Sequence, residues 1–129
     1  MPAIQEPLKE PLNLGDLLKY EAPNLYSRDL ATVAAGQALA LGTVVGRDPA
    51  TGKLSPLAPS AADSSAEAVG VLATDIDATL IDREDALLIA RHAIVASQAL
   101  VWPADITPAQ KATAILQLQA RGVLVRTAA

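Results

Sequence analysis

The clearest alternation of apolar and polar positions lies near the C-terminus, where it predicts a helix followed by a strand. Thr107 can cap the helix, Pro108 suits its first position, and Gln110 completes a capping box. Gly122 supplies the left-handed residue that commonly ends a helix. The apolar run at 123–125 then predicts a short closing strand. We therefore expect a well-defined helix between Thr107 and Gly122.

The middle of the chain carries strand patterns. Residues 37–45 alternate, so that one face of the predicted strand carries Leu39, Leu41, Thr43 and Val45. Residues 69–73 and 86–95 predict two further strands, and positions 86–90 are apolar on both faces, as is typical of a central strand. Together with the late helix, this order predicts a mainly β fold with one or two short helices, of the α+β class.

Two polar segments separate the predicted strands. Residues 47–54 predict a hairpin loop, in which Pro49 suits the first central position of a type I turn. Gly52 suits the left-handed residue that follows such a turn in a hairpin. Residues 56–66 are rich in proline, serine and alanine and predict a longer loop.

The first 30 residues differ from the rest, and we predict an arm at 1–30 followed by a β-rich domain at 31–129. Prolines interrupt any helix or central strand there, at Pro2, Pro7, Pro11 and Pro23. Asn13 can cap a single helical turn through Asp16. A segment that cannot fold alone, yet carries regular apolar residues, is suited to lie on a partner; the alternatives are a fraying tail or an arm folded back on its own domain. The residues that we expect to bind the partner are Ile4, Leu8, Leu12, Leu14, Leu17, Leu18 and Tyr20, and of these Leu14, Leu17 and Leu18 share one face of the predicted turn.

Composition narrows the class of protein. The chain has 129 residues, enough for one domain plus an arm, and only 19% of them are charged, against about 25% in an ordinary soluble domain. A chain so short of charge favours buried contacts between subunits, although an alanine-rich monomer is the alternative. The net charge is −4 and the basic residues are scattered, which argues against nucleic-acid binding. We expect no secretory signal and no membrane span, because no basic leader and no apolar run of about 18 residues is present.

Candidate catalytic and metal-binding residues are few. The acidic stretch at 75–85 fails as a calcium loop, because Leu80 and Ala86 occupy the positions that require glycine and glutamate, so we expect a solvated connection between strands. His92 is the single histidine and there is no cysteine, so a zinc site or a catalytic triad cannot be assembled. We expect His92 to be a structural or interface residue beside a strand core. We predict no enzyme, no metal and no cofactor.

Trp102 is the single tryptophan of a chain that has no phenylalanine and two tyrosines. Pro103 forces an extended backbone at Trp102, which fixes the indole just ahead of the predicted helix. A tryptophan in this position is either a plug in the core or an anchor for a partner. We take Trp102 and Pro103 as candidates for a structural role or a subunit interface.

These elements together resemble the lambda-type phage head decoration protein family. The resemblance rests on the run at 68–72 (Ala-Val-Gly-Val-Leu), the later run at 99–103 (Ala-Leu-Val-Trp-Pro), and a capped helix that ends near a terminal strand. The Gly-Lys-Leu turn at 52–54 agrees in position. The resemblance covers roughly residues 33–126.

The resemblance implies a β-clip-like fold and a structural protein of the virion. Proteins of this family are trimers that bind the outer surface of the expanded capsid at three-fold and quasi-three-fold positions and stabilise it against the pressure of packaged DNA. The implied partners are the major capsid protein, on which the N-terminal arm becomes ordered by adding a strand, and further copies of the chain. Nucleic acid and membrane are not expected partners, and synthesis in the host cytoplasm is implied.

Two other functions are alternatives to this one. A ligand- or host-binding module displayed on a virion would need an exposed aromatic or polar pocket, and three aromatic residues make that a poor fit. An enzyme that uses His92 with an aspartate such as Asp75 would lose turnover when His92 is replaced by alanine. We expect no such activity.

Overall fold

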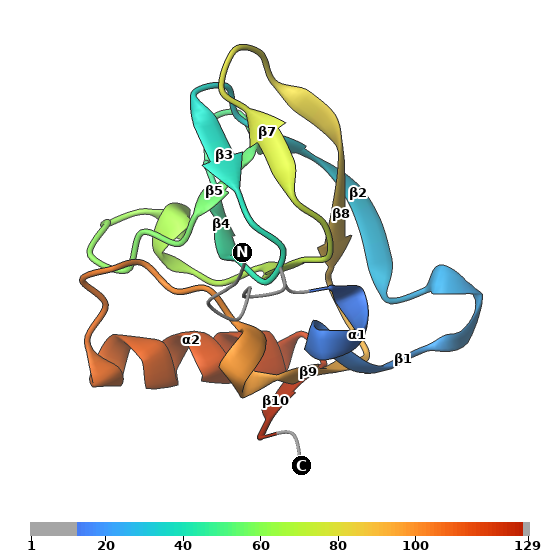
Figure 1. Ribbon diagram of the computed structural model, residues 1–129. Coiled ribbons are helices and arrows are strands. Elements are labelled where there is room, and N and C mark those ends of the chain that lie inside the picture. The colour runs from blue at the N-terminus through green and yellow to red at the C-terminus, as the bar shows by residue number, and fades with distance from the viewer. Residues whose placement is uncertain (1–12, 128–129) are drawn as a thin grey trace, which may run out of the picture.

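A closed barrel of five short strands forms the centre of the computed structural model, which describes residues 13–127 (Figure 1). Around the barrel the strands follow the order β2 (Arg28–Val33), β5 (Leu54–Pro56), β4 (Val44–Arg47), β6 (Gly70–Leu72) and β8 (Arg83–Ile89). Neighbours are antiparallel except β2 and β5, which meet in parallel at Val33 and Leu54. Closure leaves the barrel without a free edge.

A second layer lies beside the barrel, at the bottom of Figure 1. It is a three-stranded sheet in the order β1 (Leu18–Glu21), β9 (Ala93–Ala96), β10 (Val123–Arg126), in which β9 is antiparallel to β1 and parallel to β10. Helix α2 (Pro108–Ala120) and the single turn α1 (Leu14–Leu17) pack with this sheet. One core cluster combines residues of this layer with residues of the barrel strands β6 and β8. Its fully buried side chains include Leu17, Val71, Ile89, Val95, Leu118 and Val123.

The remaining elements are a two-stranded ribbon and short 3-10 segments. Strands β3 (Gln37–Leu39) and β7 (Ile76–Ala78) form an antiparallel ribbon at the top of Figure 1. Three short 3-10 segments are η1 (Pro23–Leu25), η2 (Ser64–Ala66) and η3 (Ser97–Ala99). The predicted α+β class with mainly β structure is confirmed, and the finer β-clip description stays a prediction.

The predictions that rest on local signals are confirmed. Helix α2 begins with the predicted capping box between Thr107 and Gln110, and Gly122 follows it with a φ of 85°. Asn13 caps α1 in a second capping box with Asp16. The loop between β4 and β5 turns where it was expected to, with Gly52 at a φ of 74°.

Two predicted strands were wrong, because each is broken where the chain changes layer. The strand at 37–45 is divided into β3 and β4 by Gly42, which has a φ of 93°. The strand at 86–95 ends as β8 at Ile89 and resumes as β9 at Ala93, with His92 at a φ of 48° between them. Strand β8 is nevertheless central as expected, since it pairs with both β2 and β6.

The acidic stretch at 75–85 was also only partly a solvated connection. It contains β7, in which Ile76 and Ala78 are buried. Its carboxylates accept hydrogen bonds from the chain itself: Asp75 from the amide of Leu41 at 2.7 Å, and Asp82 from the amide of Ala35 at 2.8 Å. These hydrogen bonds satisfy backbone amides next to the ribbon of β3 and β7, so Asp75 and Asp82 help to hold the ribbon in place.

Replacement of Gly42 by alanine tests the close approach that divides β3 from β4. A Cβ at residue 42 would lie 2.2 Å from the carbonyl oxygen of Ala99, and the left-handed backbone adds strain. We expect a loss of roughly 2–5 kcal/mol in the free energy of unfolding, measured by urea denaturation. Gly36→Ala is the matched control, since its φ is +94° but no atom lies within 4 Å, and it should cost only about 1 kcal/mol. Equal losses in the two variants would contradict the close approach.

Candidate interaction surfaces

The structure divides the predicted arm into two parts. Ile4, Leu8 and Leu12 lie outside the described residues. Leu17 is fully buried in the core of its own domain, and Leu14 and Leu18 pack against the same cluster. Tyr20 is 54% exposed. Residues 13–30 supply α1, β1 and the start of β2, so the boundary expected at residue 30 has to be revised: the chain joins its own fold from Asn13 onward.

The apolar pattern of Leu14, Leu17 and Leu18 suits packing on the domain's own core as well as packing on a partner, which is why the sequence did not distinguish the two. The capping box fixes the first turn, and the turn directs Leu17 between β9 and η3. A role for Leu17 on a partner surface would require it to leave this core. Burial of a leucine side chain contributes about 1.5–3 kcal/mol, which opposes that exchange.

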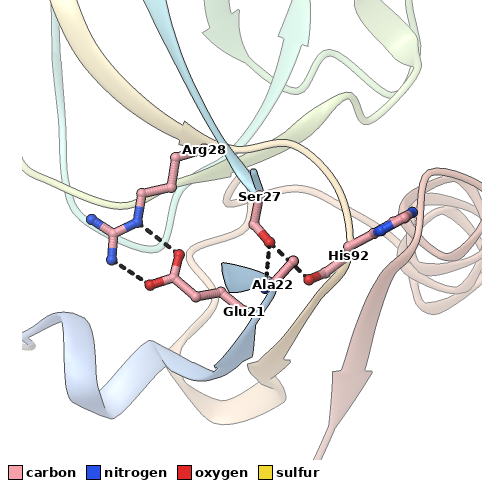
Figure 2. Close-up of polar contacts among 5 residues, drawn as sticks. All are labelled: Glu21, Ala22, Ser27, Arg28 and His92. Atoms are coloured by element: carbon pink, nitrogen blue, oxygen red, sulfur yellow. Dashed lines mark hydrogen bonds and ion pairs between the residues drawn. The ribbon is translucent and has the colours of Figure 1, made fainter. Parts of the chain in front are cut away.

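A buried serine fastens this first segment to the rest of the domain (Figure 2). Ser27 has no exposed surface, its Oγ donates to the carbonyl of His92 at 2.8 Å, and it accepts from the amide of Ala22 at 2.9 Å. The carbonyl of Ser27 in turn accepts from the amide of Ala90 at 2.8 Å. One residue therefore joins the connection between β1 and β2 to the connection between β8 and β9.

An ion pair closes the base of the same connection. Arg28 donates to both carboxylate oxygens of Glu21, at 2.6 and 2.8 Å, in the bidentate arrangement visible in Figure 2. These hydrogen bonds lower the pKa of the Glu21 carboxyl and raise that of the Arg28 guanidinium. About a quarter of each side chain is exposed, so the pair contributes modestly to stability.

The connection itself is a tight turn of unusual sequence. The amide of Tyr26 donates to the carbonyl of Pro23 at 3.4 Å, and both central residues have positive φ, 62° at Asn24 and 60° at Leu25. This is the backbone of a type I′ turn, whose second central residue is normally glycine. Asparagine tolerates the left-handed region, whereas a leucine there costs roughly 1–2 kcal/mol.

Arg91 also fixes the turn, through its last residue, Tyr26. Its guanidinium donates to the carbonyl of Tyr26 at 2.7 Å and forms a bidentate pair with Asp29 at 2.6 and 3.0 Å. The same guanidinium lies 5.3 Å from the centre of the Tyr26 ring, and the ring of His92 meets Tyr26 edge-on at 5.0 Å. The Asp29 carboxylate raises the pKa of Arg91. His92 is exposed in a bend and does not lie along a strand as predicted, but it packs on this turn.

Four large exposed apolar residues belong to β1, β2 and the turn between them, and two more belong to one other loop. The first group, which we call the β1–β2 surface, consists of Tyr20 (54% exposed), Leu25 (62%), Tyr26 (53%) and Leu30 (71%). The second is the tip between β7 and β8, where Leu80 and Ile81 are exposed. The sequence predicts no contact role for Leu25 or Tyr26, because no local pattern shows which apolar residues of 14–30 face outward.

Trp102 lies at the rim of a hollow and is half-buried. The hollow has a volume of about 290 Å³, and Val101, Trp102 and Pro103 form one wall of it, opposite residues of β3 and β4. The indole packs against the core cluster around Leu118, and Lys111 Nζ lies 5.7 Å from its ring centre. Trp102 therefore packs on the core cluster and also lines the hollow, so the two roles considered for it are compatible.

No group of three or more His, Asp or Glu side chains within 13–127 could bind a metal ion. Every buried side-chain nitrogen or oxygen in this part of the chain has a hydrogen-bond partner. Neither α1 nor α2 is long and apolar enough to cross a membrane. His92 and Asp75, the pair considered for an enzyme, contact different elements: His92 packs on Tyr26, and Asp75 binds the amide of Leu41.

Comparison with known proteins identifies one family. The family model described as bacteriophage lambda head decoration protein D matches residues 7–123. This match begins ahead of α1 and ends in β10, so it spans the described fold from its first element to its last. No curated protein matches the chain.

Removal of the buried hydroxyl at Ser27 should loosen the first segment from the domain. Ser27→Ala leaves the amide of Ala22 and the carbonyl of His92 without this partner, and we expect a loss of roughly 1–3 kcal/mol in the free energy of unfolding. Ser60→Ala is the control: this serine is exposed in the loop before η2, its Oγ accepts only an exposed 3.4 Å hydrogen bond from Gln110 Nε2, and its loss should change stability by less than about 0.5 kcal/mol. Hydrogen exchange should also quicken at Ala22. An unchanged midpoint for Ser27→Ala would show that the hydroxyl contributes nothing.

The ion pair at the base of the turn predicts a dependence of stability on pH. Arg28 lowers the pKa of Glu21 in the folded state. The ion pair therefore stabilises the fold above the pKa of an unfolded glutamate, about 4.3, and this stabilisation is lost as the pH falls further. Glu21→Gln should cost about 0.5–1 kcal/mol at pH 7 and close to nothing at pH 3. Glu84→Gln, at an exposed carboxylate of β8, is the control and should show no such difference. Urea denaturation at both pH values measures the effect, and a pH-independent cost for Glu21→Gln would refute it.

Proposed function

Because the chain belongs to the bacteriophage lambda head decoration protein D family, and is thus a structural protein of the phage capsid, we propose that it binds as a homotrimer to the outer surface of the expanded shell. There it would occupy three-fold and quasi-three-fold positions and stabilise the shell against the pressure of packaged DNA. The single observation that carries this proposal is the family match over residues 7–123. The partner proposed is the major capsid protein.

The proposed capsid-binding part is the segment that precedes Asn13. Ile4, Leu8 and Leu12 are spaced four residues apart, with Pro7 and Pro11 between them, which suits an extended chain that pairs in short pieces. Addition of such a segment to a sheet edge of the capsid protein would satisfy backbone groups on both sides. The proposed capsid-binding residues do not include Leu14, Leu17 and Leu18, because these three pack on the domain itself.

The fold that starts at Asn13 supports a capsid-binding role for the segment that precedes it. The capping box at Asn13 and the buried Leu17 fix the point from which the first twelve residues start. An arm that starts from a fixed point loses less entropy when it binds than one that follows a flexible linker, and ordering costs about 1–2 kcal/mol per residue. We propose that the fold acts as a rigid base from which the arm reaches the shell.

Self-association would multiply the effect of each arm. In a trimer the second and third arms bind intramolecularly, which raises avidity by about 10²–10⁴ without any new kind of contact. The low share of charged residues supports contact between subunits. We propose the wall of the hollow formed by Val101, Trp102 and Pro103 as part of that contact, since it exposes apolar surface beside a rigid helix start.

Removal of residues 1–12 tests the proposed role of the arm. The full-length protein should co-sediment with expanded capsids that lack a decoration protein, and the truncated form should lose about 100-fold or more in apparent affinity. The truncation keeps Asn13, Leu17 and Ser27, so its unfolding midpoint should stay unchanged. A deletion through residue 30 would remove β1 and Ser27 and is unsuitable.

A substituted arm serves as the control for chain length. Replacement of Ile4, Leu8 and Leu12 by serine should weaken binding as much as the truncation does, because apolar contacts and not length are removed. Equal binding by full-length and truncated protein would contradict the role of the arm. Binding of the full-length protein to host cells but not to capsids would favour a displayed host-binding module over a decoration protein.

A further inference from the structure

The turn between β1 and β2 has a sequence that disagrees with its backbone. Leu25 adopts a φ of 60° at a position that type I′ turns normally give to glycine. Its side chain is 62% exposed, so burial within the chain offsets little of this strain. Strained residues of this kind persist where the surrounding structure enforces them, and they cluster at functional sites.

The surroundings of the turn enforce it strongly. Arg91 donates to the carbonyl of Tyr26 at 2.7 Å and to the carboxylate of Asp29. Ser27 is buried, and its hydroxyl bonds to Ala22 within the β1–β2 connection and to His92 between β8 and β9. The result is a fixed base from which Leu25 and Tyr26 point into solvent. A partner that binds this base would pay little ordering entropy, so exposed area converts efficiently into affinity.

The chemistry of the surface indicates what it can bind. Tyr20, Leu25, Tyr26 and Leu30 are all more than half exposed. Four charged groups beside them are paired within the chain, Glu21 with Arg28 and Asp29 with Arg91, and the Lys19 ammonium donates to the carbonyl of Gly15 at 2.8 Å. A complementary partner therefore presents an apolar surface and needs no opposing charge, and tyrosine is among the residues favoured at such contacts.

We propose that the β1–β2 surface is a second, preformed contact with the capsid protein to which the arm binds. This inference rests on the proposed function and deepens it. The capsid protein is favoured over a second copy of the chain by where the arm begins. Asn13 caps α1, α1 packs with β1, and β1 runs directly into the turn.

The reach of the arm supports the same partner. Twelve residues span at most about 40 Å when fully extended, so the site of the arm on the shell lies within that distance of Asn13. The β1–β2 surface begins at Tyr20 in β1, seven residues after Asn13 and directly beyond α1. Two contacts joined by a short rigid element bind the shell cooperatively, because the first raises the effective concentration of the second.

Leu25→Gly in the full-length chain separates binding from folding. Glycine removes the exposed side chain and also relieves the left-handed strain, so the thermal midpoint should be equal to or higher than that of the wild type. Apparent affinity for expanded capsids, measured by co-sedimentation, should fall at least tenfold. Leu25→Ala keeps the strain and removes the side chain, so it should lower affinity by a similar factor. Leu116→Ala, at a leucine of α2 that is 64% exposed, is the matched control and should change neither quantity.

A second variant decides the case in which Leu25→Gly disturbs the turn. Leu30→Ser alters an exposed residue of β2 outside the turn, and it should lower capsid affinity at an unchanged midpoint. Unchanged affinity of both variants, with normal binding by the wild type, would overturn this inference and leave the proposed function standing. Absence of binding by the wild type would instead refute the proposed function. A change in the molar mass of the free protein, at unchanged affinity per copy for capsids, would assign the surface to self-association and overturn the inference.

Discussion

The structure depends on one buried residue at which two chain crossings meet. The chain passes between the second sheet and the barrel once from β1 to β2 and once from β8 to β9. Ser27 bonds to both crossings, through its hydroxyl to Ala22 and His92 and through its carbonyl to Ala90. A buried hydroxyl without partners would be costly, and here each of its hydrogen bonds also satisfies a backbone group. The turn and the exposed Leu25 follow from this junction, because both belong to the crossing from β1 to β2.

Local chemistry explains which parts of the fold could be predicted from sequence. The capping boxes at Asn13 and Thr107 and the left-handed Gly52 and Gly122 act within a few residues, so their signals are complete in the sequence. The breaks at Gly42 and His92 are different. Gly42 is required by the carbonyl of Ala99, and His92 lies against Gly122, so each break depends on a segment remote in sequence. Apolar alternation continues through both positions and could not show them.

The same distinction applies to the interaction surfaces. Leucines at 14, 17 and 18 carry the pattern of a binding helix and of a core helix alike, and only the position of β9 decides between them. Leu25 was visible as an apolar residue, yet its strain became evident only with its backbone angle. The family resemblance, in contrast, was readable from the order of 68–72, 99–103 and the capped helix, because that order reflects the whole fold. The family match over residues 7–123 confirms it.

The antiparallel pairing of β1 with β9 has a mechanical consequence for a protein that is held by its first residues. A pull on Asn13 along the axis of β1 meets the pairs Leu18–Val95, Tyr20–Ile94 and Glu21–Ala93 side by side, so they must slide apart together. Opening them one after another would require a pull across the strand. The burial of Leu17 adds resistance at the point where tension enters. Under the proposed function, a stretch of the shell that pulls on Asn13 would load this short sheet in shear, the direction in which it resists most.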